Sequence, residues 1–299
     1  QFSGIPLFSV NILLAIPAGV VSAQAQTVTT AYEDGDSFGY VIESAVSVGE
    51  GERLYTERAV SQHIVEAGEY VTSEFITFSE MRRAGADGVE VVLDAAATEV
   101  APWQVSLEAM GGVPYPLEVP ADMAAIMGDL QMFYRAAHPA FGAHRIETVY
   151  DQFSNGERHS REWASPDGSV RGGNCLTGTV QLTRLTDETA LIRAIFESPE
   201  EACIAMPGEA FDHGVAGATP NNYFLVFPGS DEGHVNLLTG RETNTVYVTL
   251  DRATGRILSG ELRQTLSVQV TSDCPTDFDC APGYPTEFGR ETTLTLSTD

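Results

Sequence analysis

Apolar and polar side chains alternate most regularly near the C-terminal end of the chain. Over residues 258–270 the even positions are mostly apolar and the odd positions are polar or charged. This period of two predicts a strand with one buried and one solvated face. Residues 245–250 form a second, β-branched segment, and the polar loop between the two contains Gly255. The pattern therefore predicts a long β-hairpin whose apolar face needs a partner layer.

Shorter segments of the same kind recur along the chain, separated by glycine-rich turn signals. They lie at 39–48, 54–60, 64–78, 89–93, 176–185, 191–196, 223–227, 235–238 and 288–296. One stretch, 121–137, has helical spacing instead: Met123, Ile126, Met127, Leu130 and Phe133 recur every three or four residues. Pro120 precedes this stretch and Pro139 ends it.

These elements predict a mainly β protein of antiparallel sheets, arranged as a sandwich or a half-barrel. The polar, turn-rich stretch 141–173 divides the chain into two β-rich halves, 26–140 and 141–299, with the helix packed across or between them. The expected architecture resembles that of bacterial envelope carriers in which a helix covers a curved sheet and an apolar groove holds a lipid tail. No sequence motif is shared with them, so the resemblance concerns architecture alone.

The first 32 residues contain no charged side chain, and residues 2–21 are largely apolar. Ala23 and Ala25 match the Ala-x-Ala pattern of a signal-peptidase site, which predicts a signal peptide at 1–25 and a mature N-terminus at Gln26. The run is too short and too interrupted by proline to favour a membrane span. We therefore expect a periplasmic or extracellular protein with no transmembrane helix in the mature chain.

The charge is strongly negative, with 42 acidic against 16 basic residues and a formal net charge of −26. Every basic residue is arginine, which excludes Schiff-base lysine chemistry. A surface of this sign repels phosphate backbones, so no nucleic-acid partner is expected. The acidity indicates either solubility in a salty medium or a cation-binding surface.

Four cysteines in an exported chain predict two disulfides. Cys175 and Cys203 come near to register when the 176–196 hairpin folds about Glu188, and Cys274 and Cys280 bracket a short loop. The expected pairs are therefore Cys175–Cys203 and Cys274–Cys280. Neither spacing is that of a zinc or redox site.

Two acidic segments of the sequence partly resemble calcium sites. Residues 34–39 imitate the start of an EF-hand loop, but Phe38 and Ala45 occupy positions that should supply oxygen ligands. Asp273, Asp277 and Asp279 crowd the Cys274–Cys280 loop and form the candidate Ca²⁺ site, with a solvated acidic turn as its alternative. No other cofactor is expected.

The common catalytic signatures are absent from the sequence: H-E-x-x-H, G-x-S-x-G, the P-loop, and G-x-G-x-x-G after a strand. The first functional hypothesis is therefore a non-catalytic protein that binds an apolar small molecule, along Met123, Met127, Leu130 and Phe133, or an envelope protein. Core packing is the alternative role of that stripe. The second hypothesis is a hydrolase with His213 or His234 beside Asp212 or Asp231. A structural subunit of a surface assembly is the third.

Overall fold

In the computed structural model, the described residues are 28, 31–68, 71–92, 99–106, 123–138, 149–151, 159–164, 169–204, 208, 220–281 and 283–297. They form thirteen strands and one helix. The N-terminal strands are β1 (Ser37–Val48), β2 (Glu52–Ala67), β3 (Val71–Gly85), β4 (Glu90–Val92) and β5 (Glu99–Ser106). They are followed by α1 (Ala124–Ala137), β6 (Val149–Asp151), β7 (His159–Ala164), β8 (Arg171–Leu185) and β9 (Thr189–Glu197). The last strands are β10 (Tyr223–Pro228), β11 (His234–Asp251), β12 (Ile257–Pro275) and β13 (Tyr284–Ser297).

All thirteen strands belong to one antiparallel sheet. Its main path runs β10-β8-β9-β11-β12-β13-β1-β2-β3-β4, while β5 pairs with β3, and β6 and β7 pair with β8. The predicted fold class is confirmed, and the single sheet corresponds to the half-barrel alternative. The sheet is also continuous between the two predicted β-rich halves, because β1 pairs with β13 and places Tyr40 opposite Leu296.

The predicted C-terminal hairpin is formed by β11 and β12, the two longest strands among the described elements. Leu250 pairs with Ile257 across the turn, and Gly255 in that turn has a φ of 75°, which suits glycine. Along β1, the even residues from Phe38 to Val46 are buried and Glu43 is exposed. Successive side chains of a strand point to opposite faces, so one face of the sheet is the core and the other is solvated.

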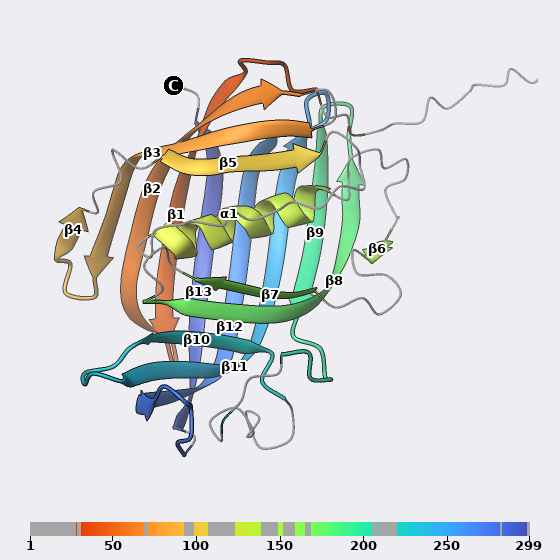
Figure 1. Ribbon diagram of the computed structural model, residues 1–299. Coiled ribbons are helices and arrows are strands. Elements are labelled where there is room, and N and C mark those ends of the chain that lie inside the picture. The colour runs from red at the N-terminus through yellow and green to blue at the C-terminus, as the bar shows by residue number, and fades with distance from the viewer. Residues whose placement is uncertain are drawn as a thin grey trace, which may run out of the picture.

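The sheet curves around α1, as Figure 1 shows, with β5 on one side of the helix and β7 on the other. The helix packs against β9, β11 and β12. Ten of its 14 residues are buried, so burial extends beyond the single stripe that the sequence pattern predicts. No side chain caps the helix N-terminus at Met123. Tertiary packing rather than local capping therefore stabilises this helix.

The main hydrophobic core lies between α1 and the concave face of the sheet. It joins helix residues such as Ile126 and Leu130 to strand residues such as Ile42, Ile76 and Val248. A smaller cluster gathers Phe224, Val226, Leu237, Cys274 and Phe278 at the end of the sheet where β10 pairs with β11. The larger core is thus the environment of the buried apolar side chains of the helix.

Candidate functional site

The stripe predicted to bind an apolar ligand lies at the centre of the main core. Met123 is 3% exposed, and Met127, Leu130 and Phe133 are fully buried. A Cβ atom added to Gly260 of β12 would lie 2.5 Å from Cε1 of Phe133, so the ring rests almost on the backbone of the sheet. The structure therefore uses all four side chains for packing. Ligand binding by them stays a prediction.

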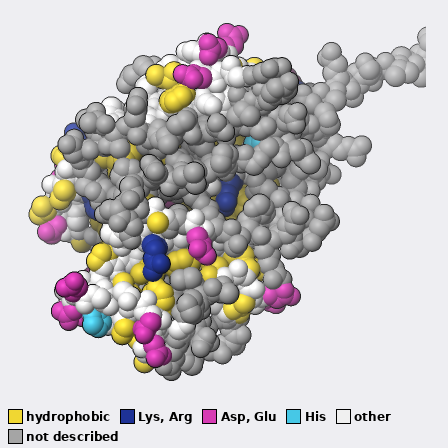
Figure 2. All heavy atoms as spheres, viewed as in Figure 1, with side chains coloured by type: hydrophobic (Ala, Val, Ile, Leu, Met, Phe, Trp, Pro, Cys, Tyr) yellow, Lys and Arg dark blue, Asp and Glu magenta, His cyan; other side chains and the backbone are white. Residues whose placement is uncertain are grey.

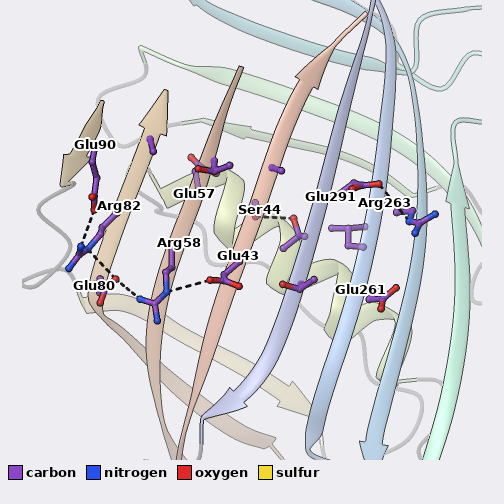
Figure 3. Close-up of a pocket in the computed structure, with 16 residues that line it drawn as sticks. Glu43, Ser44, Glu57, Arg58, Glu80, Arg82, Glu90, Glu261, Arg263 and Glu291 are labelled. Atoms are coloured by element: carbon purple, nitrogen blue, oxygen red, sulfur yellow. Dashed lines mark hydrogen bonds and ion pairs between the residues drawn. The ribbon is translucent and has the colours of Figure 1, made fainter. Parts of the chain in front are cut away.

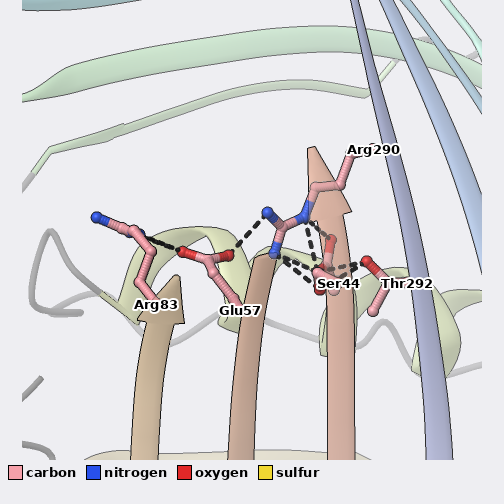
Figure 4. Close-up of polar contacts among 6 residues, drawn as sticks. Ser44, Glu57, Arg83, Arg290 and Thr292 are labelled. Atoms are coloured by element: carbon pink, nitrogen blue, oxygen red, sulfur yellow. Dashed lines mark hydrogen bonds and ion pairs between the residues drawn. The ribbon is translucent and has the colours of Figure 1, made fainter. Parts of the chain in front are cut away.

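Beneath the helix lies a buried charged network centred on Asp129 of α1 and Arg290 of β13. Figure 4 labels Arg290 with Ser44, Glu57, Arg83 and Thr292, which belong to the same network. The Asp129 carboxylate accepts hydrogen bonds from Arg290, at 2.9 Å from Nε and 2.7 Å from Nη2. It also accepts bonds from the hydroxyls of Thr292, at 2.9 Å, and Ser44, at 3.2 Å. A single helical carboxylate is thereby tied to two neighbouring strands, β1 and β13.

The network continues across the sheet through Glu57 of β2. Nη1 of Arg290 lies 2.8 Å from Oε2 of Glu57, and Nη2 of Arg83 on β3 lies 2.7 Å from the other carboxylate oxygen, Oε1. Burial acts to lower the pKa of Arg290, but the charge and hydrogen bonds of Asp129, together with the charge of Glu57, outweigh it and raise the pKa. Two carboxylates and two guanidiniums alternate, so the buried charges compensate one another.

A second buried polar cluster brings together Ser61, His63, Glu74 and Tyr134. Ser61 Oγ lies 3.0 Å from His63 Nε2, and His63 Nδ1 lies 3.4 Å from Glu74 Oε2. The hydroxyl of Tyr134, from α1, donates to the same Glu74 oxygen at 2.7 Å. Burial, and then the nearby Glu74 charge, raise the pKa of Tyr134. The order serine–histidine–carboxylate is that of an activated nucleophile.

This second cluster is enclosed. Ser61 is 1% exposed, while His63 and Glu74 are fully buried. Phe38 stacks on the His63 ring with 5.1 Å between ring centroids, and Tyr40 meets the same ring edge-on at 5.1 Å. Glu74 Oε1 has no hydrogen-bond partner. In this conformation the cluster therefore ties the helix to β2 and β3, and its serine has no access to solvent.

A third polar cluster surrounds Glu242 of β11. Its carboxylate accepts hydrogen bonds from the side-chain amides of Asn174, at 2.9 Å, Asn244, at 2.7 Å, and Gln264, at 2.8 Å. Burial, followed by the Glu242 charge, raises the pKa of Tyr223. The amides satisfy both carboxylate oxygens, which makes burial of the charge tolerable without an ion pair.

The opposite face of the sheet bears a trough of about 890 Å³. Figure 3 shows its charged side chains in front of the strands, with α1 behind them. Arg58 pairs with Glu80 and with Glu43, the latter at 3.6 Å, while Arg82 pairs with Glu80 at 3.1 Å and Glu90 at 3.0 Å. These partly exposed pairs make a solvated mixed-charge surface, and each contributes little to stability.

Both predicted disulfides are present. Cys175 pairs with Cys203, with 6.2 Å between Cα atoms, and Cys274 pairs with Cys280 at 5.7 Å. The aspartates of the candidate calcium site make local hydrogen bonds instead. The Asp273 carboxylate accepts hydrogen bonds from Ser230 Oγ at 2.8 and 2.9 Å, and those bonds lower its pKa. Asp277 accepts a bond from the backbone N–H of Asp279.

The three aspartates therefore do not converge. Within the described residues, no group of three or more His, Cys, Asp or Glu side chains is arranged to hold a metal ion. The structure thus gives the expected Ca²⁺ site no support. Of the predicted hydrolase residues, Asp212 and His213 lie outside the described residues. His234 donates its backbone N–H to the carbonyl of Asp231 at 3.1 Å, a turn contact rather than a side-chain relay.

In the view of Figure 2, Asp and Glu side chains are scattered around the edge of the molecule and basic side chains are fewer. In the part of the chain that the structure describes, no helix is long and apolar enough to cross a membrane.

No protein-family model matches the chain, and no curated protein matches it. Among solved structures, OmpF of Salmonella typhi, in a complex with daunomycin, matches at a TM-score of 0.24 and 8% identity, covering 89% of this chain and 99% of that one. The outer membrane protein OpdK of Pseudomonas aeruginosa matches at a TM-score of 0.19 and 6% identity, covering 88% and 99% of the two chains. OccK2 (OpdF) of the same organism matches at 0.17 and 8% identity, covering 89% and 98%. Similarities at these TM-scores carry no argument about fold or function.

Proposed function

We propose that the protein is an exported, non-catalytic binding protein that holds an apolar ligand between α1 and the concave face of the sheet. The observation that carries this proposal is the make-up of that interface. All four methionines among the described residues, Met81, Met123, Met127 and Met132, lie in the main core. Thioether side chains are flexible and polarisable, so they repack around ligands of irregular shape more readily than branched side chains do.

Two further observations support the proposal. Both disulfides are of the structural kind that persists in oxidising compartments, which fits an exported protein. Hydrogen bonds also connect the helix to the sheet: Asp129 accepts from Arg290, and Tyr134 donates to Glu74. Apolar side chains such as Ile126, Met127 and Leu130 pack between these contacts, and a ligand that separated the apolar side chains would leave the polar contacts in place.

Native mass spectrometry of gently purified protein tests the proposal. We expect an excess mass that disappears on denaturation and that organic extraction recovers as an apolar compound. Ligand-stripped protein should also take up the neutral dye N-phenyl-1-naphthylamine in a saturable way. Met127→Leu together with Met132→Leu should weaken uptake, whereas Arg58→Gln on the opposite face should not. A bare monomer that binds no dye would refute the proposal and favour a protein partner instead.

A hydrolase is the second candidate, favoured by the Ser61–His63–Glu74 order. In such an enzyme Ser61 Oγ would attack an ester carbonyl and pass its proton to His63, which would return it to the leaving alcohol; water would then release the acid. A fluorophosphonate probe tests this candidate. Labelling of the wild-type protein that is lost in both Ser61→Ala and His63→Ala supports it, and an unlabelled native protein rules it out.

A further inference from the structure

The main path of the sheet ends at β4, and this edge carries a small exposed apolar patch. Val89, Val91 and Val92 are 61, 53 and 70% exposed, so three of the seven exposed large apolar side chains among the described residues lie within four positions. Figure 1 shows β4 at the outer end of the sheet, and Figure 2, in the same view, shows apolar side chains at that edge. β-Branched residues favour strands, so an edge of this composition is suited to further strand pairing.

The backbone of β4 is paired on one side alone among the described residues. The N–H of Gly85 donates to the carbonyl of Val89 at 3.1 Å, and Val91 pairs with β3 two positions further along. Backbone groups of a strand point alternately to its two sides, so Val89 and Val91 direct theirs toward β3. Glu90 and Val92 therefore direct their N–H and C=O groups away from β3, where no described strand meets them. Such an edge is a template for a strand of another chain.

A second copy of the same edge satisfies these backbone groups in one antiparallel register. With Val91 opposite Val91 of the second copy, Glu90 of each copy faces Val92 of the other, and both members of those pairs have free backbone groups. The two Val91 side chains then meet in the non-hydrogen-bonded position, where cross-strand side chains are closest. The pairing has two-fold symmetry, so it saturates both edges and closes on itself.

The charges beside β4 favour this register over its neighbour. Nη1 of Arg82 lies 3.0 Å from Oε1 of Glu90 in the same chain, and Val92 stands directly opposite Arg82. In the two-fold register, Glu90 of the second copy comes next on the same row, two strand spacings or about 10 Å from Arg82. Each guanidinium thus lies between carboxylates of both copies. A shift of the second copy by two residues would instead place the two Glu90 carboxylates opposite each other, which is unfavourable.

We propose that two copies of the protein associate edge to edge through β4, so that the sheet continues from one copy into the other. This inference is independent of the ligand proposed above, because α1 packs against β9, β11 and β12. The net charge of −26 on each copy opposes association, and a strand of three residues supplies few hydrogen bonds. The dimer should therefore be weak, and it should tighten with salt, which screens the repulsion.

Cross-linking through single introduced cysteines tests the register. The native cysteines all form disulfides, so an introduced cysteine supplies the one free thiol. In Val91→Cys the two thiols face each other across the two-fold axis, with Cα atoms about 4.5 Å apart, a distance that a disulfide can bridge. In Val89→Cys, the matched control, they lie about 14 Å apart along the strands, which is too far. After mild oxidation, Val91→Cys should give at least about tenfold more covalent dimer than Val89→Cys on non-reducing electrophoresis.

Sedimentation equilibrium measures the reversible dimer of the full chain. Val91→Lys places two like charges opposite each other and should weaken the dimer about tenfold, even though it reduces the net negative charge. Tyr247→Lys makes the same change of charge at an exposed position of β11, six strands along the sheet from β4, and should not weaken the dimer. If Val91→Lys does not fold, the conservative Val91→Cys variant decides.

Four results would overturn the inference. The wild-type protein could remain monomeric at about 1 mM protein and about 0.3 M salt, or its dimer could weaken as salt rises from about 0.05 M to about 0.3 M. The two cysteine variants could cross-link equally, or Val91→Lys could leave the dimer unchanged. Either of these last two results would place the contact between copies away from β4.

Discussion

The charged network beneath α1 makes a quantitative prediction about Asp129. We expect Asp129→Asn to destabilise the fold strongly, because it keeps the shape of the side chain but removes the charge that faces Arg290. Both partners are nearly inaccessible, with side chains 4% and 8% exposed. The guanidinium would stay buried and lose the negative charge of the group that accepts from both Nε and Nη2.

The expected size follows from these contacts. Removing one partner of a buried ion pair costs about 3–5 kcal/mol. Arg290 would keep Glu57 at 2.8 Å, so the loss should fall at the lower end, about 3 kcal/mol in the free energy of unfolding. Glu43→Gln is the matched control. Glu43 is 63% exposed and lies 3.6 Å from Arg58, so its loss should cost no more than about 1 kcal/mol.

Urea unfolding under non-reducing conditions, followed by circular dichroism and tryptophan fluorescence together, measures both variants. With a slope of about 3 kcal/mol per molar urea, Asp129→Asn should lower the midpoint by about 1 M. A cycle with Arg290→Met should also show coupling of at least about 1 kcal/mol. If Asp129→Asn destabilises no more than Glu43→Gln, the network does not hold the helix and the reasoning is wrong.

Three further predictions concern stability. Gly260→Ala should lower the free energy of unfolding by about 1–3 kcal/mol, because the new methyl group crowds Phe133, and adding Phe133→Leu should restore part of that stability. Gly128→Ala, where the space around the new Cβ atom is open, should instead raise the stability by about 0.5–1 kcal/mol in thermal melts. Removing the Cys175–Cys203 disulfide, whose cysteines are 28 positions apart, should lower the free energy of unfolding by about 3.6 kcal/mol. Removing Cys274–Cys280, whose cysteines are six positions apart, should lower it by about 2.2 kcal/mol, because a shorter loop restricts the unfolded chain less. If paired Cys→Ala variants show the opposite order, the loop-entropy argument is wrong. Burial lowers the pKa of His138, so the unfolded state takes up a proton at this residue at a higher pH than the folded state does. The free energy of unfolding should therefore decrease as the pH falls below about 6.5. In His138→Gln this decrease with pH should be smaller.

Local patterns in the sequence are enough to predict the helix, the disulfide pairs and the longer strands, whereas β6 and β7 lie in the stretch 141–173 that the turn signals marked as a boundary, and the predicted segment 64–78 spans the turn between β2 and β3. Alternation over 258–270 corresponds to β12, and the helical stripe corresponds to α1 up to its last residue, Ala137. Cys175 and Cys203 were paired by folding one hairpin about its turn, which is a local operation. These features depend on neighbours in the sequence or on a single hairpin.

The polar networks could not be predicted in the same way, because their partners are remote. Asp129 and Arg290 are 161 positions apart, and Tyr134 and Glu74 are 60 apart. One signal was nevertheless present: Asp129 lies within the apolar stripe, between Met127 and Leu130, where a carboxylate must find partners when buried. Ser61 and His63 likewise occupy alternate positions on the buried face of β2.

Two buried polar side chains of α1, Asp129 and Tyr134, connect the helix to the sheet, and their contacts indicate which part of the helix is costliest to displace. Asp129, near the middle of the helix, accepts from three different residues. Tyr134, nearer the C-terminal end of the helix, donates to the Glu74 carboxylate at 2.7 Å. Opening the helix at Asp129 would expose compensated buried charges and is the costliest route. The proposed ligand is therefore expected to enter away from Asp129.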